Sequence, residues 1–240
     1  MGSRTTAWDR LGDYLHQTKI TGSIASTLYW DQNTRMPSGG ASWRGEQLAL
    51  LAIQLHSRQS SREYADLIQE ARVEWSQSGL STTEKAACGR NLDLLEQDLG
   101  RQQALDPALV AALATAKADG YNTWQQARAN SDFGVFAPSL RTMIGLRQEQ
   151  ARQLAEPRSC WETLAQPFEP DLTLKRLLEL FAPLRQRLPE LLQQAGRQPR
   201  QRELSWDLPE PAQQQLCDTL LTHWGRDASM TCVARSPHPF

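Results

Sequence analysis

A large excess of unbranched over β-branched side chains is the feature that most limits how this chain can fold. Leucine occurs 34 times and glutamine 24 times, whereas valine and isoleucine together occur only 9 times. Leucine and glutamine lose little side-chain freedom in a helix, while strands are built mainly from β-branched and aromatic residues. At 240 residues the chain is also long enough to bury a sizeable core. The sequence therefore predicts an all-α protein.

Apolar residues at helical spacing, together with capping signals, place the expected helices along the chain. Helices are expected over about 7–19, 24–35, 42–57, 82–103, 107–129, 137–155, 160–165, 173–191 and 207–224. A capping box at 60–63 is expected to open one more helix, after the one over 42–57. The cap residues at 21–23 predict a break between the first two helices. A short loop joins the helices over 82–103 and 107–129, so we expect them to pack antiparallel. Pro183 and Pro189 predict a kink or a break in the helix after Thr173.

The charge balance and the cysteine spacing exclude several classes of protein. The 26 basic and 27 acidic side chains give a net charge of -1, without the basic surface of a dedicated nucleic-acid binder. No stretch approaches the ~20 apolar residues that span a bilayer, and the N-terminus lacks the apolar core of a signal peptide. The four cysteines, Cys88, Cys160, Cys217 and Cys232, are too widely spaced for a zinc knuckle or a CxxC motif. We therefore expect a soluble cytoplasmic protein that binds neither nucleic acid nor membrane.

The self-contained catalytic motifs HExxH, GxSxG, GxGxxG and the P-loop are absent from the 240 residues. His16, His56, His223 and His238 are scattered, and none belongs to the i, i+4 pair that binds zinc on one helix face. The simplest interpretation is that these histidines are packed or lie on the surface. His238 differs because prolines on both sides hold its backbone extended. From the residues alone, His238 is either a site residue on a rigid turn or part of an ordinary proline-rich loop.

Two aromatic and polar clusters are candidates for recognition. The first is residues 29–32 (YWDQ), and the favoured alternative is a packed helix whose Asp31 and Gln32 face a loop. The second comprises Trp124, Asn130, Asp132 and Phe136, where Asp132 is most simply a cap for the following helix. For both clusters the structural interpretation is favoured over a binding site.

Several short blocks, in order along the chain, resemble the carboxypeptidase Taq-like zinc metallocarboxypeptidases. They are residues 28–32 (LYWDQ) with 36–37 (MP), 44–49 (RGEQLA), Trp124 with 127–133 (ARANSDF), 136–140 (FAPSL), 169–173 (EPDLT) and 238–240 (HPF). The fifth block is similar to an EPG-T turn of that family, with Asp171 at the glycine position. The resemblance extends from about residue 11 to residue 240.

The resemblance implies an almost entirely helical fold in which long antiparallel helices wall a deep cleft with zinc at its base. In that family the HExxH helix and a further glutamate ligand follow the HPF motif, so no metal ligand or general base falls within these 240 residues. Residues 1–240 are therefore expected to form a single helical region that corresponds to the N-terminal half, truncated before the metal-binding helix. Zinc is the cofactor of the full-length family, and this chain is not expected to retain it. His238 is the one suspected substrate-cleft residue.

Two functions remain open at this point. In the first, the chain is the N-terminal part of a zinc-dependent carboxypeptidase. The whole enzyme releases single C-terminal amino acids from peptides, and this part is inactive without the other half. In the second, the chain is a catalytically dead helical module that binds a peptide or a protein. The resemblance implies a peptide as the partner and leaves a homodimer open.

Overall fold

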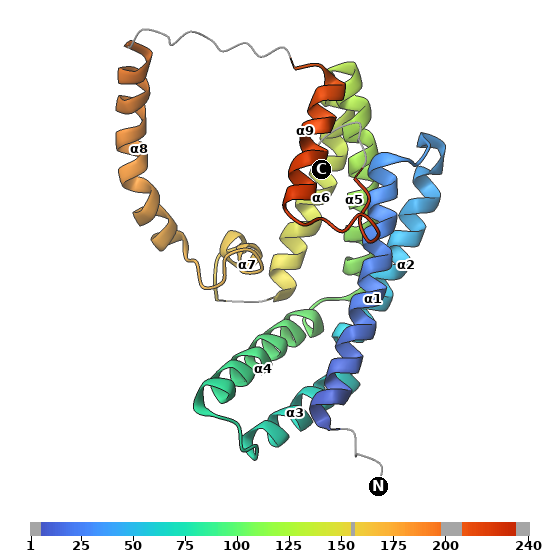
Figure 1. The fold of residues 1–240 in the computed structure, drawn as a ribbon, viewed down its shortest axis with the longest axis vertical. Helices are drawn as coiled ribbons and strands as arrows, with labels where there is room; N and C mark the ends of the chain where they lie inside the picture. The colour runs from blue at the N-terminus through green and yellow to red at the C-terminus, as the bar shows by residue number, and fades with distance from the viewer. Residues whose placement is uncertain (1–5, 155–156, 198–207, 234–240) are drawn as a thin grey trace. The chain divides into compact units, whose positions relative to one another are not determined.

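The computed structural model of the protein describes residues 6–154, 157–197 and 208–233, and no strand occurs in these ranges. The elements, shown in Figure 1, are α1 (Ala7–Thr34), the 3-10 helix η1 (Ser38–Gly40), α2 (Ala41–Gln59), α3 (Arg62–Ser76), α4 (Thr82–Gln103), α5 (Pro107–Asn130), α6 (Phe133–Leu154), α7 (Cys160–Ala165), α8 (Leu174–Arg197) and α9 (Glu210–His223). The all-α prediction is confirmed. No described helix is both long enough and apolar enough to cross a membrane.

Helix starts follow the capping chemistry of the sequence closely. The Ser81 hydroxyl accepts a hydrogen bond from the Glu84 amide and the Glu84 carboxylate accepts one from the Ser81 amide, so α4 opens with a full capping box. The Ser81 hydroxyl, and after it the Ser81 amide, donate hydrogen bonds to the Glu84 carboxylate and lower its pKa. Asp106 caps α5, whose first residue is Pro107. At α3 the capping residue is Ser61, whose hydroxyl accepts from Tyr64. Because the third helical residue there is Tyr64, this cap is not the predicted capping box.

The predicted break between two N-terminal helices is wrong, because α1 is continuous from Ala7 to Thr34. The residues taken for a cap turn their hydroxyls back onto the helix. Thr21 donates to the carbonyl oxygen of Gln17 at 3.0 Å, and Ser23 donates to that of Ile20 at 2.7 Å. Serine and threonine satisfy their own hydrogen bonds in this way inside a helix, so they need not end one.

The chain divides into two compact units, Met1–Pro170 and Asp171–Phe240. In the first unit α1 packs on α2 and α3, α3 packs on α4, and α5 packs on α2 and α6 (Figure 1). The predicted antiparallel packing of α4 on α5 is wrong, because a short loop constrains only the ends of two helices. Here α2 contacts both α4 and α5, and the faces that α5 buries lie against α2 and α6. The expectation of a single helical region over residues 1–240 stays a prediction.

The core of the first unit forms where α1, α3 and α4 meet. It contains Ala7, Leu11, Tyr14, Tyr64, Ile68, Ala71, Leu92 and Leu99. The Tyr14 and Tyr64 rings stack with centroids 5.4 Å apart. Burial raises the pKa of Tyr64 to about 12, and the negative charge of Asp98 and the neighbouring Tyr14 act in the same direction. The core therefore holds a phenol that must stay neutral.

Replacing Tyr64 by phenylalanine is expected to remove part of the loss of stability at alkaline pH. An unfolded tyrosine has a pKa of about 10, so folding raises the pKa of Tyr64. The stability that the neutral phenol contributes is fully present below about pH 10 and is lost as the pH rises towards about 12. Urea unfolding across this pH window measures the effect. Tyr29→Phe, which leaves Tyr64 in place, should keep the wild-type alkaline loss, and an equal loss in Tyr64→Phe contradicts this explanation.

The second unit contains α8 and α9. Its first residue, Asp171, has a φ of 64°, in the left-handed region that glycine adopts most easily. This agrees with the glycine at that position of the EPG-T turn. Thr173 caps α8 through its hydroxyl, which accepts from the Arg176 amide at 3.2 Å. The prediction at Pro183 and Pro189 was a kink or a break, and the helix runs through both prolines without a break.

Candidate functional site

Arg44 joins two of the sequence blocks that carry the family resemblance. Its side chain is largely buried at the start of α2, and its Nη2 lies 2.5 Å from Oδ2 of Asp31 near the end of α1. Its Nη1 donates to the carbonyl oxygen of Leu28, and its Nε donates to Oε1 of Gln47 at 2.9 Å. The rigid guanidinium therefore fixes the end of α1 against the start of α2.

Asp31 and Gln32 do not behave as the sequence predicted. Asp31 faces α2 instead of a loop, because Arg44 supplies a charged partner there. Gln32 and the adjacent Asn33 are 4% and 2% exposed, and neither side-chain amide has a hydrogen-bond partner in the described structure. A buried amide without a partner costs about 1 to 3 kcal/mol. The end of α1 therefore carries unused hydrogen-bonding capacity directly beside the Arg44 ion pair.

The third block of the resemblance forms the junction between α5 and α6. Ser131 ends α5 in the left-handed conformation, with a φ of 53°. Asp132 then accepts a hydrogen bond from the Gly134 amide at 2.8 Å, which confirms its predicted capping role. Phe133 and Phe136 pack edge to face with their centroids 6.2 Å apart. The capping hydrogen bond therefore gives Asp132 a structural role at this junction.

The described histidines do not form a metal site. His56 is buried and its Nδ1 lies 3.3 Å from Oε1 of Gln102, while His16 and His223 are exposed. Both interpretations offered by the sequence, packed and surface histidines, are thus confirmed for these three. His238 lies outside the described residues. Across the described ranges, no group of three or more histidine, cysteine or acidic side chains is placed to hold a metal ion.

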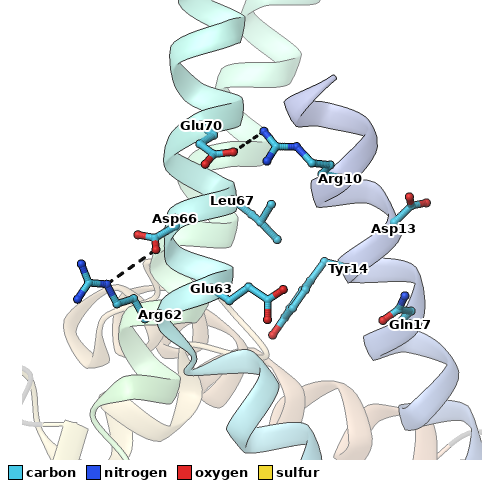
Figure 2. Close-up of a pocket in the computed structure, with 9 residues that line it drawn as sticks. All are labelled: Arg10, Asp13, Tyr14, Gln17, Arg62, Glu63, Asp66, Leu67 and Glu70. Atoms are coloured by element: carbon cyan, nitrogen blue, oxygen red, sulfur yellow. Dashed lines mark hydrogen bonds and ion pairs between the residues drawn. The ribbon is translucent and has the colours of Figure 1, made fainter. Parts of the chain in front are cut away.

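A groove between α1 and α3 gathers titratable side chains, as Figure 2 shows. It has a volume of about 630 Å³ and is lined by Arg10, Asp13, Tyr14, Gln17, Arg62, Glu63, Asp66, Leu67 and Glu70. Arg10 pairs with Glu70 at 2.5 Å and Arg62 with Asp66 at 3.8 Å, and both pairs are solvent-exposed. Exposed pairs of this kind contribute about 0 to 1 kcal/mol. The groove is therefore a polar surface whose charges remain available.

The groove lacks the pair of a histidine base with a serine or cysteine nucleophile that triad hydrolases use, and its acidic groups are carboxylates. Tyr14 is occupied structurally, since its hydroxyl donates to the carbonyl oxygen of Arg58 at 2.8 Å and its ring lies under the Arg58 guanidinium. The lining residues include no histidine, cysteine or serine that would act as base or nucleophile. This groove was not predicted from the sequence. The signal was present as Glu63, Asp66 and Glu70, which recur at helical spacing on one face of α3.

The helical fold and these blocks define a protein of the helical metallocarboxypeptidase class. The sequence model of the carboxypeptidase Taq (M32) metallopeptidase family matches residues 10–240. The chain belongs to this family, as the sequence blocks predicted.

Individual relatives match almost all of this chain. Thermostable carboxypeptidase 1 of Thermus thermophilus is 28% identical over 98% of this chain and 48% of its own length. Carboxypeptidase 1 of Bacillus subtilis is 23% identical over 95% of this chain and 45% of its own length. The BsuCP crystal structure superposes with a TM-score of 0.85 at 22% identity, covering 98% of this chain and 46% of its own. The structure of Trypanosoma cruzi metallocarboxypeptidase 1 has a TM-score of 0.73 at 26% identity, and the match covers 98% of this chain and 47% of that one. The chain thus spans about half the length of the relatives it matches.

Proposed function

We propose that this chain supplies the N-terminal half of a zinc-dependent metallocarboxypeptidase that releases single C-terminal amino acids from peptides. The observation that carries the proposal is the family match over residues 10–240, which includes every helix from α2 to α9 and most of α1. The chain nevertheless covers only about half of each relative's length. Its role in the proposal is to build part of the framework around the peptide cleft.

The described residues do not fit a zinc site, since no cluster of potential ligands occurs among them. The HExxH motif is also absent from the sequence. In this proposal the zinc ligands and the general base belong to the part of the enzyme that corresponds to the unmatched half of the relatives. The residues of this chain act by holding helices in place, as Arg44 does between α1 and α2.

The proposal is tested by assaying the 240-residue chain alone. We expect the dialysed chain to retain no stoichiometric zinc and to release no amino acid from the C-termini of peptides. Zinc is measured by atomic emission and free amino acids by mass spectrometry, with an identically purified mock preparation as the control for host peptidases. Release of C-terminal residues by the chain, above the mock preparation, contradicts the assignment of the catalytic groups to the other half.

His238 has a proposed role in the completed enzyme. Its flanking prolines restrict the backbone, which suits a side chain held at the cleft, where an imidazole can hydrogen-bond the substrate or the developing oxyanion. We expect His238→Ala, made in the completed enzyme, to lower turnover about 10²-fold or more with little change in melting temperature. Unchanged turnover, or a loss matched by a comparable loss of stability, indicates instead that the HPF segment has a structural role.

A second candidate is a helical module that binds a peptide or protein without catalysis. The exposed groove between α1 and α3 favours it, because Asp13 and Glu63 line that groove with no ion-pair partner among the described residues. The nucleotide sequence downstream of the Phe240 codon separates the two candidates. A coding continuation with HExxH supports the carboxypeptidase, and a stop codon in an expressed, stable protein supports the binding module. The peptide substrate and the cytoplasmic location stay predictions from the sequence.

A further inference from the structure

The two units differ sharply in how much of their apolar surface they bury. The first unit has a core of fully buried side chains that includes Leu11, Ile68 and Leu92. In the second unit no residue is buried among those described, 171–197 and 208–233. A segment that buries so little apolar surface does not offset the conformational entropy lost on folding. The second unit therefore depends on a surface that it does not itself contain.

Much of the exposed apolar surface of the second unit lies on one face of α8, and a smaller part lies on α9 and beside it, as at Leu216, Leu220 and Trp224. Apolar residues recur at helical spacing along the whole helix, and all of them except the half-buried Leu177 are exposed: Leu174, Leu177, Leu178, Leu180, Phe181, Leu184, Leu188, Leu191 and Leu192. Phe181 and Leu188, near the middle of this leucine face, are each 50% exposed. The opposite side carries polar residues such as Gln186 and Gln193. This pattern is typical of a helix that packs one face against a protein core.

The internal prolines make it more difficult for α8 to form alone. Pro183 and Pro189 each remove a helical hydrogen bond and crowd the preceding turn. An isolated helix is only marginally stable in water even without such residues. A helix that runs unbroken from Leu174 to Arg197 through two prolines therefore needs a partner along its leucine face.

We propose that the leucine face of α8 is the docking surface for the half of the carboxypeptidase fold that this chain does not match. The family match continues through α8 and α9 to residue 240, so α8 belongs to the shared fold. The relatives contain about as much chain again outside the matched part, since this chain covers 48% and 45% of them. That unmatched half is the source of the missing core. The inference rests on the proposed function, because it takes its occupant from the completed enzyme.

Hydrogen exchange on the 240-residue chain tests whether α8 lacks cover. We expect amides of α8 to exchange at near-unfolded rates, while those of α3 and α4 stay protected about 10²-fold or more. Protection of α8 equal to that of α4 in a monomer means that the first unit covers it and overturns the inference. Protection that rises with protein concentration assigns the face to a second copy and likewise overturns it.

The occupant is tested by co-expressing the chain with the unmatched half of Thermostable carboxypeptidase 1 from Thermus thermophilus. We expect co-purification and at least about tenfold slower exchange in α8. Phe181→Glu with Leu188→Glu should abolish both effects. Gln186→Glu with Gln193→Glu adds the same charge to the opposite side of the helix and should preserve them. Absence of co-purification, or equal loss in both double variants, overturns the inference.

The readouts separate this inference from the proposed function. A complex that hydrolyses peptides while α8 exchange is unchanged rejects the docking surface and leaves the proposed function standing. A complex in which α8 is protected but zinc-loaded protein hydrolyses no peptide rejects the proposed function and leaves the docking surface standing.

Discussion

Replacing Arg44 by alanine is expected to lower the free energy of unfolding by about 3 kcal/mol, because it leaves a carboxylate at the α1–α2 junction without its partner. The Arg44 side chain is 11% exposed and that of Asp31 is 35% exposed, so water only partly replaces the lost contact. The carbonyl oxygen of Leu28 and the amide oxygen of Gln47 lose their donor at the same time. Urea unfolding at neutral pH measures the change.

The chain contains a matched control for this prediction. Arg10 and Glu70 are also 2.5 Å apart, but their side chains are 49% and 48% exposed. Arg10→Ala should therefore cost less than about 1 kcal/mol, since exposed pairs are worth little. The double variant Arg44→Met with Asp31→Leu should recover most of the stability, because it removes both charges together. Equal losses for Arg44→Ala and Arg10→Ala would show that burial does not set the strength of this contact.

Replacing Leu92 by alanine is expected to cost about 2 to 5 kcal/mol, through lost burial and the cavity that remains. Leu92 is fully buried on α4, in the core it shares with Ile68 and Ala71 of α3. Leu94→Ala makes the same change on the same helix at a side chain that is 40% exposed, and should cost less than about 1 kcal/mol. Comparable losses in the two variants, measured by urea unfolding, would contradict the position assigned to this core.

Local signals in the sequence predicted most of the fold, because helix ends are decided by short-range chemistry. Ser81, Asp106 and Asp132 each cap a helix by accepting a hydrogen bond from a backbone amide two or three residues further along the chain. These hydrogen bonds depend on neighbours in the chain and can be read from residue order. The family blocks at 28–32, 44–49 and 127–133 were recognisable for a related reason, since they lie towards helix ends and junctions, where residue type is tightly constrained.

Contacts between distant residues were beyond such reasoning. Nothing local indicates that Arg44 reaches back to Asp31, or that α5 packs on α2 and not on α4. The continuity of α1 was missed because serine and threonine have two uses, as caps and as donors to the preceding turn. The helix after Thr173 was predicted, but its lack of buried residues becomes visible only in three dimensions.

The most direct test of the account is a chimera in which residues 10–240 of this chain replace the matching part of Thermostable carboxypeptidase 1 from Thermus thermophilus. Release of C-terminal amino acids from a peptide is measured for the chimera, the parent enzyme and the 240-residue chain. We expect the chimera to retain zinc and to release amino acids from the peptide, and we expect the 240-residue chain alone to do neither. A chimera that retains zinc without releasing amino acids, or a chain that releases them unaided, contradicts this expectation.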